Sequence, residues 1–444
     1  MEPFGAVLLA AGQGIRMKSE RPKVLHQVLG TPMVRLAYRA LRDAGADPVI
    51  VVVGYQAESV RQALAGEPVI FVEQRERKGT GHAVLLCEKA ARRVRGPLVV
   101  MYGDTPLVSP ATLEALVAAH RRERPGAVAG AAATLLTVRL ADPTGYGRII
   151  RDPRGPLRGI VEEADATPEQ RRIEEVNPGF YCFDPAALFP ALRRIKPENR
   201  KGEYYLTDVI RILLLGGAEV RAIPARDPEE VLGVNSRRDL AAATEALRRR
   251  EIDRHLDAGV TILDPAATYI EPGVTIGTDT VIFPFTVIRS GVRIGRHCEV
   301  GPFAQLRSGT VLEDGAEIGN FVEVKRSRLG PHTKAKHLTY LGDAEVGGRV
   351  NIGAGTITAN YDGTSKHATV IEDGASTGSG TVLIAPVRMG RGSRTGAGAI
   401  VPARHDIPAG ATVIGVPARP LIRPPAAVSR PTSGRKPAQR RGRA

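Results

Sequence analysis

The chain is poor in aromatic residues and in cysteine. Tryptophan is absent from its 444 residues, aromatic side chains make up 4%, and cysteine occurs three times. So few aromatic residues argue against a platform on which the bases of single-stranded nucleic acid stack. The cysteines, Cys87, Cys182 and Cys298, are odd in number and far apart. Such spacing excludes a disulfide framework and a cysteine-rich metal site as the basis of the fold.

Long hydrophobic segments are lacking as well. No apolar run approaches the roughly 20 residues that cross a bilayer. The N-terminal region carries Glu2, has no basic residues before its apolar stretch, and that stretch ends at Gly12. A secretory signal peptide has the opposite pattern. We therefore expect a cytoplasmic protein with no membrane partner.

Basic residues exceed acidic ones, 62 to 47, for a formal charge of +15. About half of the excess lies in residues 421–444, which hold seven Arg and Lys residues, four prolines and no acid. This composition predicts a disordered tail. The rest of the chain is only mildly basic, so we regard nucleic acid as an improbable partner. Binding of nucleic acid through the tail stays open as a hypothesis.

Strand and helix patterns alternate over the first half of the chain. Short apolar runs predict buried strands at residues 6–10, 49–53, 69–72 and 98–102. Helical patterns cover residues 33–44, 57–64, 81–93 and 112–122, and residues 236–252 resemble a connecting helix. This alternation predicts an α/β, Rossmann-like domain with a mostly parallel sheet and helices on both faces. Ligands bind such sheets beyond the carboxyl ends of the strands.

A period of six residues replaces this pattern after about residue 260. The apolar positions are Ile276, Ile282, Ile288, Ile294, Val300, Leu306, Leu312, Ile318 and Val324, with further in-phase sets from Val346 and from Ile371. A hexapeptide repeat fits a parallel β-helix of prismatic section, with one strand per face and 18 residues per coil. The two breaks in phase predict inserted loops near residues 327–345 and 359–370.

These patterns give the domain organisation. We predict a nucleotide-binding domain at residues 1–232, a linker helix at 233–253, a β-helix at 254–420 and the basic tail at 421–444.

A glycine-rich turn follows the first predicted strand. Residues 10–17 read Ala-Ala-Gly-Gln-Gly-Ile-Arg-Met, and a Pro-Lys pair ends at Lys23. Backbone amides of such a turn approach phosphates closely, and Arg16 and Lys23 can neutralise their charge. Asp104 follows the strand at 98–102, so its carboxylate is suited to hold Mg²⁺ together with phosphate and water.

This set of motifs resembles the sugar-nucleotide pyrophosphorylases, with further similar segments around Gln74, Tyr102, Gly147, Glu162, Asn177 and Asn235. The resemblance implies that UTP is bound by Leu9, Ala10, Ala11, Gly12, Arg16, Lys23, Gln74, Gly79, Thr80, Tyr102 and Gly103. It implies Asp104 and Asn235 as Mg²⁺ ligands. It also places Gly147, Glu162 and Asn177 around N-acetylglucosamine-1-phosphate. The reaction would be in-line attack of the sugar phosphate on the α-phosphorus of UTP, with release of pyrophosphate.

The β-helix half carries a second group of polar residues. Arg307 and Lys325 supply positive charge suited to a sugar phosphate. His337 is the candidate general base, because an imidazole with a pKa of about 6.5 can take a proton from an amine near neutral pH. It is one of nine histidines, and His332 and His367 also lie near the breaks in phase.

The run from Gly319 to Asp362, and both halves in this order, resemble one family over roughly residues 5–418. These are the bifunctional bacterial glucosamine-1-phosphate N-acetyltransferases and N-acetylglucosamine-1-phosphate uridylyltransferases. The resemblance implies a left-handed β-helix, His337 as base, and homotrimers with a site between neighbouring prisms. It places Arg307, Lys325, Tyr340, Asn351 and Lys366 around glucosamine-1-phosphate. It places Ala354, Asn360, Tyr361, Ser379 and Ala397 along acetyl-CoA.

The leading hypothesis is therefore an enzyme that acetylates glucosamine-1-phosphate and then couples the product to UTP, giving UDP-N-acetylglucosamine. The alternative is a single-activity nucleotidyltransferase whose β-helix serves only trimerisation.

Overall fold

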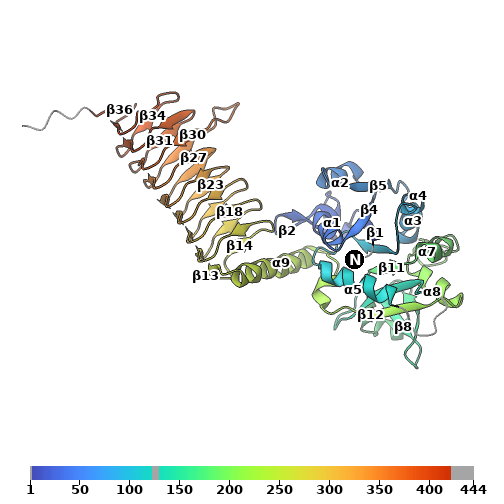
Figure 1. Cartoon of the computed structure of the whole chain (residues 1–444). Coiled ribbons are helices and arrows are strands. Elements are labelled where there is room, and N and C mark those ends of the chain that lie inside the picture. Colours follow the sequence, from blue (N-terminus) through green and yellow to red (C-terminus); the bar gives the residue numbers. More distant parts are fainter. Residues whose placement is uncertain (1–2, 123–129, 422–444) are drawn as a thin grey trace, which may run out of the picture. The chain divides into compact units, whose positions relative to one another are not determined.

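The computed structural model describes residues 3–122 and 130–421. These residues form two compact units, the first with its main segment ending at Ala258 and the second beginning at Gly259 (Figure 1).

The first unit is built on a ten-stranded sheet. Its central strand β1 (Phe4–Ala10) pairs in parallel with β4 (Ala46–Val53) and with β6 (Leu98–Tyr102). Strand β5 (Val69–Glu73) continues the parallel set beside β4. These are the four strands that the apolar runs predict, so the parallel sheet is confirmed where the glycine-rich turn begins.

The other half of the sheet is mainly antiparallel. Strand β11 (Tyr181–Phe183) joins β6 to β7 (Ala133–Arg139) by antiparallel pairing. The sheet is completed by β8 (Gly147–Arg151), β9 (Leu157–Val161), β10 (Glu175–Asn177) and β12 (Val220–Pro224). A separate hairpin pairs β2 (Gln27–Val28) with β3 (Thr31–Pro32).

Helices cover both faces of this sheet. Alternate residues of β1 enter different hydrophobic cores: Leu8 packs with Leu41 and Leu113 on one face, and Leu9 packs with Val84 and Leu206 on the other. Burial of both faces explains why the strands are continuous apolar runs. The helices are α1 (Met33–Asp43), α2 (Ala57–Ala63), α3 (Thr80–Leu85), α4 (Glu88–Ala91), α5 (Pro110–Arg121), α6 (Pro168–Arg171), α7 (Pro185–Leu192), α8 (Asp208–Leu215) and α9 (Arg237–Asp257).

Two predicted helices have other bounds in the structure: the one at 81–93 is divided, and the one at 236–252 extends to Asp257 as α9. The segment predicted as one helix at 81–93 forms α3 and α4, separated at Leu86 and Cys87. Helix α9 begins at a capping box, in which the Ser236 hydroxyl accepts a hydrogen bond from the Asp239 amide and the Asp239 carboxylate accepts one from the Ser236 amide. That pairing satisfies two amides at the helix start. Short 3₁₀ turns are η1 (Ile15–Met17), η2 (Lys23–Leu25) and η3 (Pro228–Val231).

The second unit is a left-handed parallel β-helix with three faces (Figure 1). The first face contains β13 (Thr261–Ile262), β16 (Val281–Ile282), β19 (Glu299–Val300), β22 (Glu317–Asn320), β25 (Lys334–His337) and β28 (Asn351–Ile352), with β33 (Arg394–Thr395), β35 (Thr412–Ile414) and β36 (Arg419–Pro420) further along. The second contains β14 (Tyr269–Ile270), β17 (Val287–Ile288), β20 (Gln305–Leu306), β23 (Glu323–Lys325), β26 (Tyr340–Gly342), β29 (Ile357–Ala359), β31 (Val382–Ile384) and β34 (Ile400–Val401). The third contains β15 (Thr275–Ile276), β18 (Arg293–Ile294), β21 (Val311–Leu312), β24 (Arg328–Leu329), β27 (Ala344–Val346), β30 (Thr369–Ile371) and β32 (Val387–Met389).

The hexapeptide positions point inward, as predicted: those from Ile282 to Val324 are buried. The first break in phase is not an insertion, so the loop predicted near 327–345 is wrong. Strands β24 to β27 continue the three faces without interruption. Two corners are each one residue shorter, since the inward residue Leu329 follows Val324 after five positions and Val346 follows Leu341 likewise.

The second break is a true excursion. The inward residue Ile371 follows Thr358 after thirteen positions, and residues 360–368 leave the coil as a small loop closed by a bridge between Tyr361 and Lys366. The Asp362 carboxylate accepts amide hydrogen bonds from Thr364 and Ser365, at 2.8 and 2.7 Å, and thereby orders the turn.

All three cysteines are buried and free. Within the described residues, no helix has the length and apolar character that crossing a membrane requires. The predicted basic tail, apart from Leu421, lies outside the described residues.

Candidate active sites

The first candidate site lies at the carboxyl ends of β1 and β6. Because Leu9 pairs with Tyr102, the turn after β1 and the segment after β6 meet at one edge of the sheet. They enclose a pocket of about 220 Å³. Nine predicted residues line it: Leu9, Ala11, Gly12, Lys23, Gln74, Gly79, Thr80, Tyr102 and Asp104. Ala10 and Gly103 are buried next to them, and the Gly103 amide donates to the Leu9 carbonyl at 2.9 Å.

The two predicted metal ligands, Asp104 and Asn235, both contact the ammonium group of Lys23. The Lys23 ammonium forms an ion pair with the Asp104 carboxylate and donates a hydrogen bond to Asn235 Oδ1 at 2.9 Å. The Arg16 guanidinium donates to the same Asn235 oxygen, also at 2.9 Å. Sequence residues 16, 23, 104 and 235 are therefore brought together at one point.

This arrangement fits a divalent metal ion. A carboxylate and an amide oxygen already share one positive charge, the ammonium of Lys23, and hard cations prefer such oxygen ligands. Among the described residues, no group of three or more His, Cys, Asp and Glu side chains is arranged to hold a metal. A metal at Asp104 and Asn235 would therefore take its other ligands from water and phosphate, as Mg²⁺ commonly does.

Of the residues predicted to hold the sugar, Gly147 and Asn177 lie on the paired strands β8 and β10, and Glu162 follows the adjacent strand β9. Gly147 pairs with Asn177 between β8 and β10, and a Cβ atom at Gly147 would lie 3.6 Å from the Glu162 carboxylate. The Asn177 side chain is fixed, because its carbonyl accepts from the Gly179 amide at 3.1 Å and its amide donates to Tyr181 at 2.6 Å. Burial raises the pKa of Glu162.

Sequence reasoning missed several residues here. Thr207 donates to Glu162 at 3.0 Å, and Tyr205, Thr207 and Glu162 line a pocket of about 310 Å³ whose lining includes neither Gly147 nor Asn177. The Tyr205 hydroxyl is buried with no hydrogen-bond partner among the described residues. Arg77 and Glu203 line the pocket at the ends of β1 and β6. The run Glu203-Tyr204-Tyr205-Leu206-Thr207 carries no glycine-rich or charged signature by which it could have been found.

The second candidate site lies on the β-helix. His337 is the last residue of β25, is exposed, and borders a hollow of about 220 Å³ on the first face. Its Nδ1 atom is 2.9 Å from Asn320 Oδ1 on the neighbouring strand β22. An exposed imidazole with one nitrogen already engaged leaves the other free to act on a ligand.

Positive charge gathers on the second face. The charges of Arg307 and Lys366 lower the pKa of Lys325, so both of these cations lie near its ammonium group. Arg307 donates to Glu323 at 2.8 Å, and Glu323 pairs in register with Tyr340. Such a cluster is suited to a phosphate group, whose charge would relieve the repulsion.

Three of the five predicted acetyl-CoA residues, Ala354, Ser379 and Ala397, form one column. Backbone hydrogen bonds between successive coils link the rungs Asn320, His337, Ala354, Ser379 and Ala397: Leu338 donates to Asn320, Gly355 to His337, Gly380 to Ala354 and Gly398 to Ser379. Asn360 and Tyr361 stand in the loop that follows β29. Asn351, by contrast, lies on the first face beside Lys334, whereas Tyr340 and Lys325 lie on the second.

The residues that directly follow this column along the chain change from large apolar side chains to glycine after the coil that contains His337. Its positions are Phe285, Phe303, Phe321 and Leu338, then Gly355, Gly380 and Gly398. The three phenyl rings stack at 4.8 and 5.1 Å and are exposed.

All seven of these residues have a positive φ, from 48° at Leu338 to 75° at Gly355. The left-handed backbone of this corner therefore accommodates residues with side chains, so it does not by itself require glycine. A Cβ atom at Gly398 would meet nothing within 4 Å. The three glycines thus leave a strip without side chains beside Ala354, Ser379 and Ala397, which we call the glycine groove.

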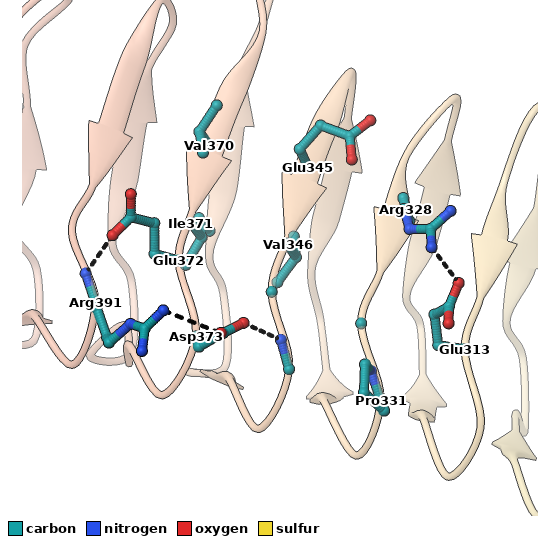
Figure 2. A pocket seen from close by; sticks show the side chains of 13 residues that line it. Glu313, Arg328, Pro331, Glu345, Val346, Val370, Ile371, Glu372, Asp373 and Arg391 are labelled. Carbon is teal, nitrogen blue, oxygen red and sulfur yellow. Dashed lines mark hydrogen bonds and ion pairs between the residues drawn. The ribbon is translucent and has the colours of Figure 1, made fainter.

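A larger pocket of about 480 Å³ lies on the third face and contains none of the predicted residues (Figure 2). Its charged side chains are mostly paired: Arg328 with Glu313 at 2.7 Å, and Arg391 with Asp373 at 3.7 Å. Four acidic and two basic side chains line this pocket, so its net charge is negative and does not suit a phosphate.

Comparison with known proteins covers both units of the chain. Residues 6–211 match the model of the MobA-like NTP transferase domain, and residues 273–307 and 291–326 match that of the bacterial transferase hexapeptide, six repeats. The chain is 45% identical over 442 residues to the bifunctional protein GlmU of Heliobacterium modesticaldum, a match that covers 92% of this chain and 94% of that protein. The chain belongs to the GlmU family. The GlmU proteins of Halalkalibacterium halodurans, at 43% identity, and Thermobifida fusca, at 44%, are also similar over 92% and 93% of this chain and 95% and 92% of those proteins.

Proposed function

We propose that this GlmU-family chain makes UDP-N-acetylglucosamine by two reactions. Residues 254–420 acetylate glucosamine-1-phosphate from acetyl-CoA, and residues 1–232 then couple N-acetylglucosamine-1-phosphate to UTP with release of pyrophosphate. Residues 233–253 connect the two. The near-full-length similarity to proteins described as bifunctional does not favour the single-activity alternative.

The uridylyl transfer needs positioning and charge neutralisation. Backbone amides of the glycine-rich turn and the Arg16 and Lys23 side chains bind the triphosphate, while Gln74, Gly79 and Thr80 bind the uridine end. Glu162 and Asn177 hold the acetylated sugar, so its phosphate oxygen faces the α-phosphorus. Attack forms the new P–O bond and pyrophosphate leaves with the electrons of the broken one.

We propose Mg²⁺ as the metal, held by Asp104 and Asn235. It would supply charge neutralisation on the phosphates. The support is the convergence of both side chains on the Lys23 ammonium, which has to move away from Asp104 to let a metal in and is then free to contact phosphate.

The acetyl transfer is proposed to use His337 as base. The glucosamine nitrogen attacks the thioester carbonyl, His337 accepts the amine proton, and the C–S bond breaks to release coenzyme A. Arg307, Lys325, Tyr340, Asn351 and Lys366 hold the sugar phosphate. Ala354, Asn360, Tyr361, Ser379 and Ala397 line the path of acetyl-CoA.

We propose that the working form is a homotrimer in the cytoplasm. The exposed stack of Phe285, Phe303 and Phe321 is an apolar strip that a second copy can cover. Asn351 lies on a different prism face from Tyr340 and Lys325, so a neighbouring copy would complete the pocket around one sugar phosphate. Neither reaction requires a membrane or nucleic acid.

The observation that carries the proposal is that His337 ends a strand of the first prism face while the cation cluster lies on the second, with the glycine groove at the corner between these two faces. The test is a coupled assay with glucosamine-1-phosphate, acetyl-CoA, UTP and Mg²⁺, each omitted in turn, following free thiol and pyrophosphate. His337→Ala should abolish thiol release from glucosamine-1-phosphate and spare pyrophosphate release from supplied N-acetylglucosamine-1-phosphate. Persistent acetyl transfer in that variant would refute the assignment of the base.

A further inference from the structure

We propose that Asn320 is a positioning residue for acetyl transfer, whose side-chain carbonyl holds the Nδ1 proton of His337 and so makes Nε2 the atom that accepts the amine proton. This inference rests on the proposed role of His337 as base.

The contact follows from the register of the coils. Asn320 ends β22 and His337 ends β25, and the two residues are direct partners in the parallel ladder between these strands. The Leu338 amide donates to the Asn320 carbonyl at 3.0 Å, which fixes the two backbones at this rung. Their side chains therefore leave the prism side by side, and Asn320 Oδ1 lies 2.9 Å from His337 Nδ1.

Glycine makes the close approach possible. A Cβ atom at Gly319, the residue before Asn320, would overlap the backbone of Lys336, the residue before His337. The chain thus brings these two strands together immediately before the two side chains that meet. In the same column the rung on the other side of His337 is Ala354, whose methyl group offers no hydrogen bond to the imidazole.

The hydrogen bond determines which nitrogen is basic. A carbonyl oxygen can only accept, so the Nδ1 atom must carry the proton when it bonds to Asn320. The neutral imidazole then has its lone pair on Nε2, the atom directed away from Asn320. In the reaction the amine nitrogen forms the amide bond, its proton passes to Nε2, and the C–S bond breaks. The proton then passes on to the departing thiolate, which leaves His337 as it began.

An amide is a better acceptor here than a carboxylate would be. A neutral carbonyl orients the ring without adding a negative charge that would favour the imidazolium. The charged groups that face His337 across the hollow are Glu299 of β19, Glu317 of β22 and Lys336 of β25. Glu317 already accepts from Lys334 at 2.9 Å and from Lys336, so it is engaged by those lysines. At the corner itself, Phe321 and Leu338 are uncharged.

The test uses three variants of the full-length enzyme and measures kcat and KM for acetyl transfer across pH. Asn320→Leu keeps the size of the side chain and removes the acceptor, so kcat should fall about tenfold or more while KM for acetyl-CoA changes little. Asn320→Asp should restore activity at high pH and move the acidic limb of the kcat/KM profile upward by about one pH unit. Glu317→Gln is the matched control, because it removes a carboxylate from the same strand without touching His337, and its acidic limb should stay within a few tenths of a pH unit of the parent.

Uridylyl transfer measured on the same samples should be unchanged in all three variants, which separates a local effect from misfolding. Two results would overturn the inference: an Asn320→Leu profile identical to that of the parent enzyme, or a downward shift of the acidic limb in Glu317→Gln as large as the upward shift in Asn320→Asp. The experiments distinguish failure of this inference from failure of the proposed function. If His337→Ala retains acetyl transfer, the base assignment fails. If His337→Ala is inactive while Asn320→Leu is fully active, only the positioning role fails.

Discussion

The open groove beside Ala354, Ser379 and Ala397 can be tested by filling it. Gly380 occupies the corner position at which the preceding coils carry Phe285, Phe303 and Phe321, and a Cβ atom there would meet only ordinary contacts at 3.8 Å. A Gly380→Phe variant should therefore fold. Its residue would adopt a left-handed conformation at a cost of about 1–2 kcal/mol, which corresponds to a fall in melting temperature of several degrees.

The effect on the acyl donor is expected to be larger. If the phenyl ring keeps about 100 Å² of acetyl-CoA out of the groove, about 25 cal/mol per Å² gives about 2.5 kcal/mol. That free energy corresponds to a roughly 70-fold rise in KM for acetyl-CoA. Gly380→Ala adds one methyl group and should change KM less than about threefold.

The chain offers a matched control at another corner of the prism. Gly374 and Gly392 have φ values of 68° and 65°, and a Cβ atom at either would meet nothing within 4 Å. Gly392→Phe should lose the same stability as Gly380→Phe and keep the parent KM for acetyl-CoA. A thiol-release assay and thermal melts on the three variants suffice. Equal KM values for acetyl-CoA in Gly380→Phe and Gly392→Phe would refute the placement of the acyl donor in this groove.

Three further predictions concern charged groups. Asp104→Asn should lower uridylyl transfer by about 100-fold or more and raise the Mg²⁺ concentration needed, with acetyl transfer unchanged; unaltered metal dependence in a pyrophosphate-release assay would exclude Asp104 as a ligand. Because burial raises the pKa of Glu162, its carboxylate takes a proton at higher pH than an exposed glutamate does. KM for N-acetylglucosamine-1-phosphate should therefore rise as the pH falls, and Glu162→Gln should remove that dependence; a parallel rise in the variant would assign it to another group. Arg307→Gln should raise KM for glucosamine-1-phosphate about tenfold and leave KM for acetyl-CoA unchanged, and the reverse pattern would move the phosphate elsewhere.

The patterns with a strict period were the most predictable parts of the fold. Four strands of the α/β unit are continuous apolar runs because helices cover both sheet faces, and the inward positions of the β-helix recur every six residues. Strands β8 to β11 have three to five residues each and include polar side chains such as Arg148 and Asn177. Nothing local distinguishes such strands, since they are defined by pairing with residues far away in the chain.

The same limit applies to the sites. The glycine-rich turn and Asp104 are adjacent to strong strand signals, so their meeting at one sheet edge could be predicted. The contact of Asn320 with His337 depends on a coil of 17 rather than 18 residues. In the sequence, losing one residue at each of the corners Val324–Leu329 and Leu341–Val346 shifts the six-residue period by two positions. A loss of two positions and an insertion of four give the same phase, so the periodicity predicts an insertion there. Only the ladder pairing of β22 with β25 separates two small deletions from one long loop.

Those shortened corners show how this architecture tolerates changes in length. In a flat sheet, removing one residue from a strand exchanges its buried and exposed sides. In the prism, each strand has only two to four residues, and the missing position falls where the chain turns, at the left-handed residues Arg326 and Asp343. The loss is absorbed there, and the apolar residues beyond it return to the interior. Residues can therefore be lost or added at the corners of the β-helix, as in the two shortened corners and the loop at residues 360–368. Such changes alter the outer surface while the inward apolar residues keep their places.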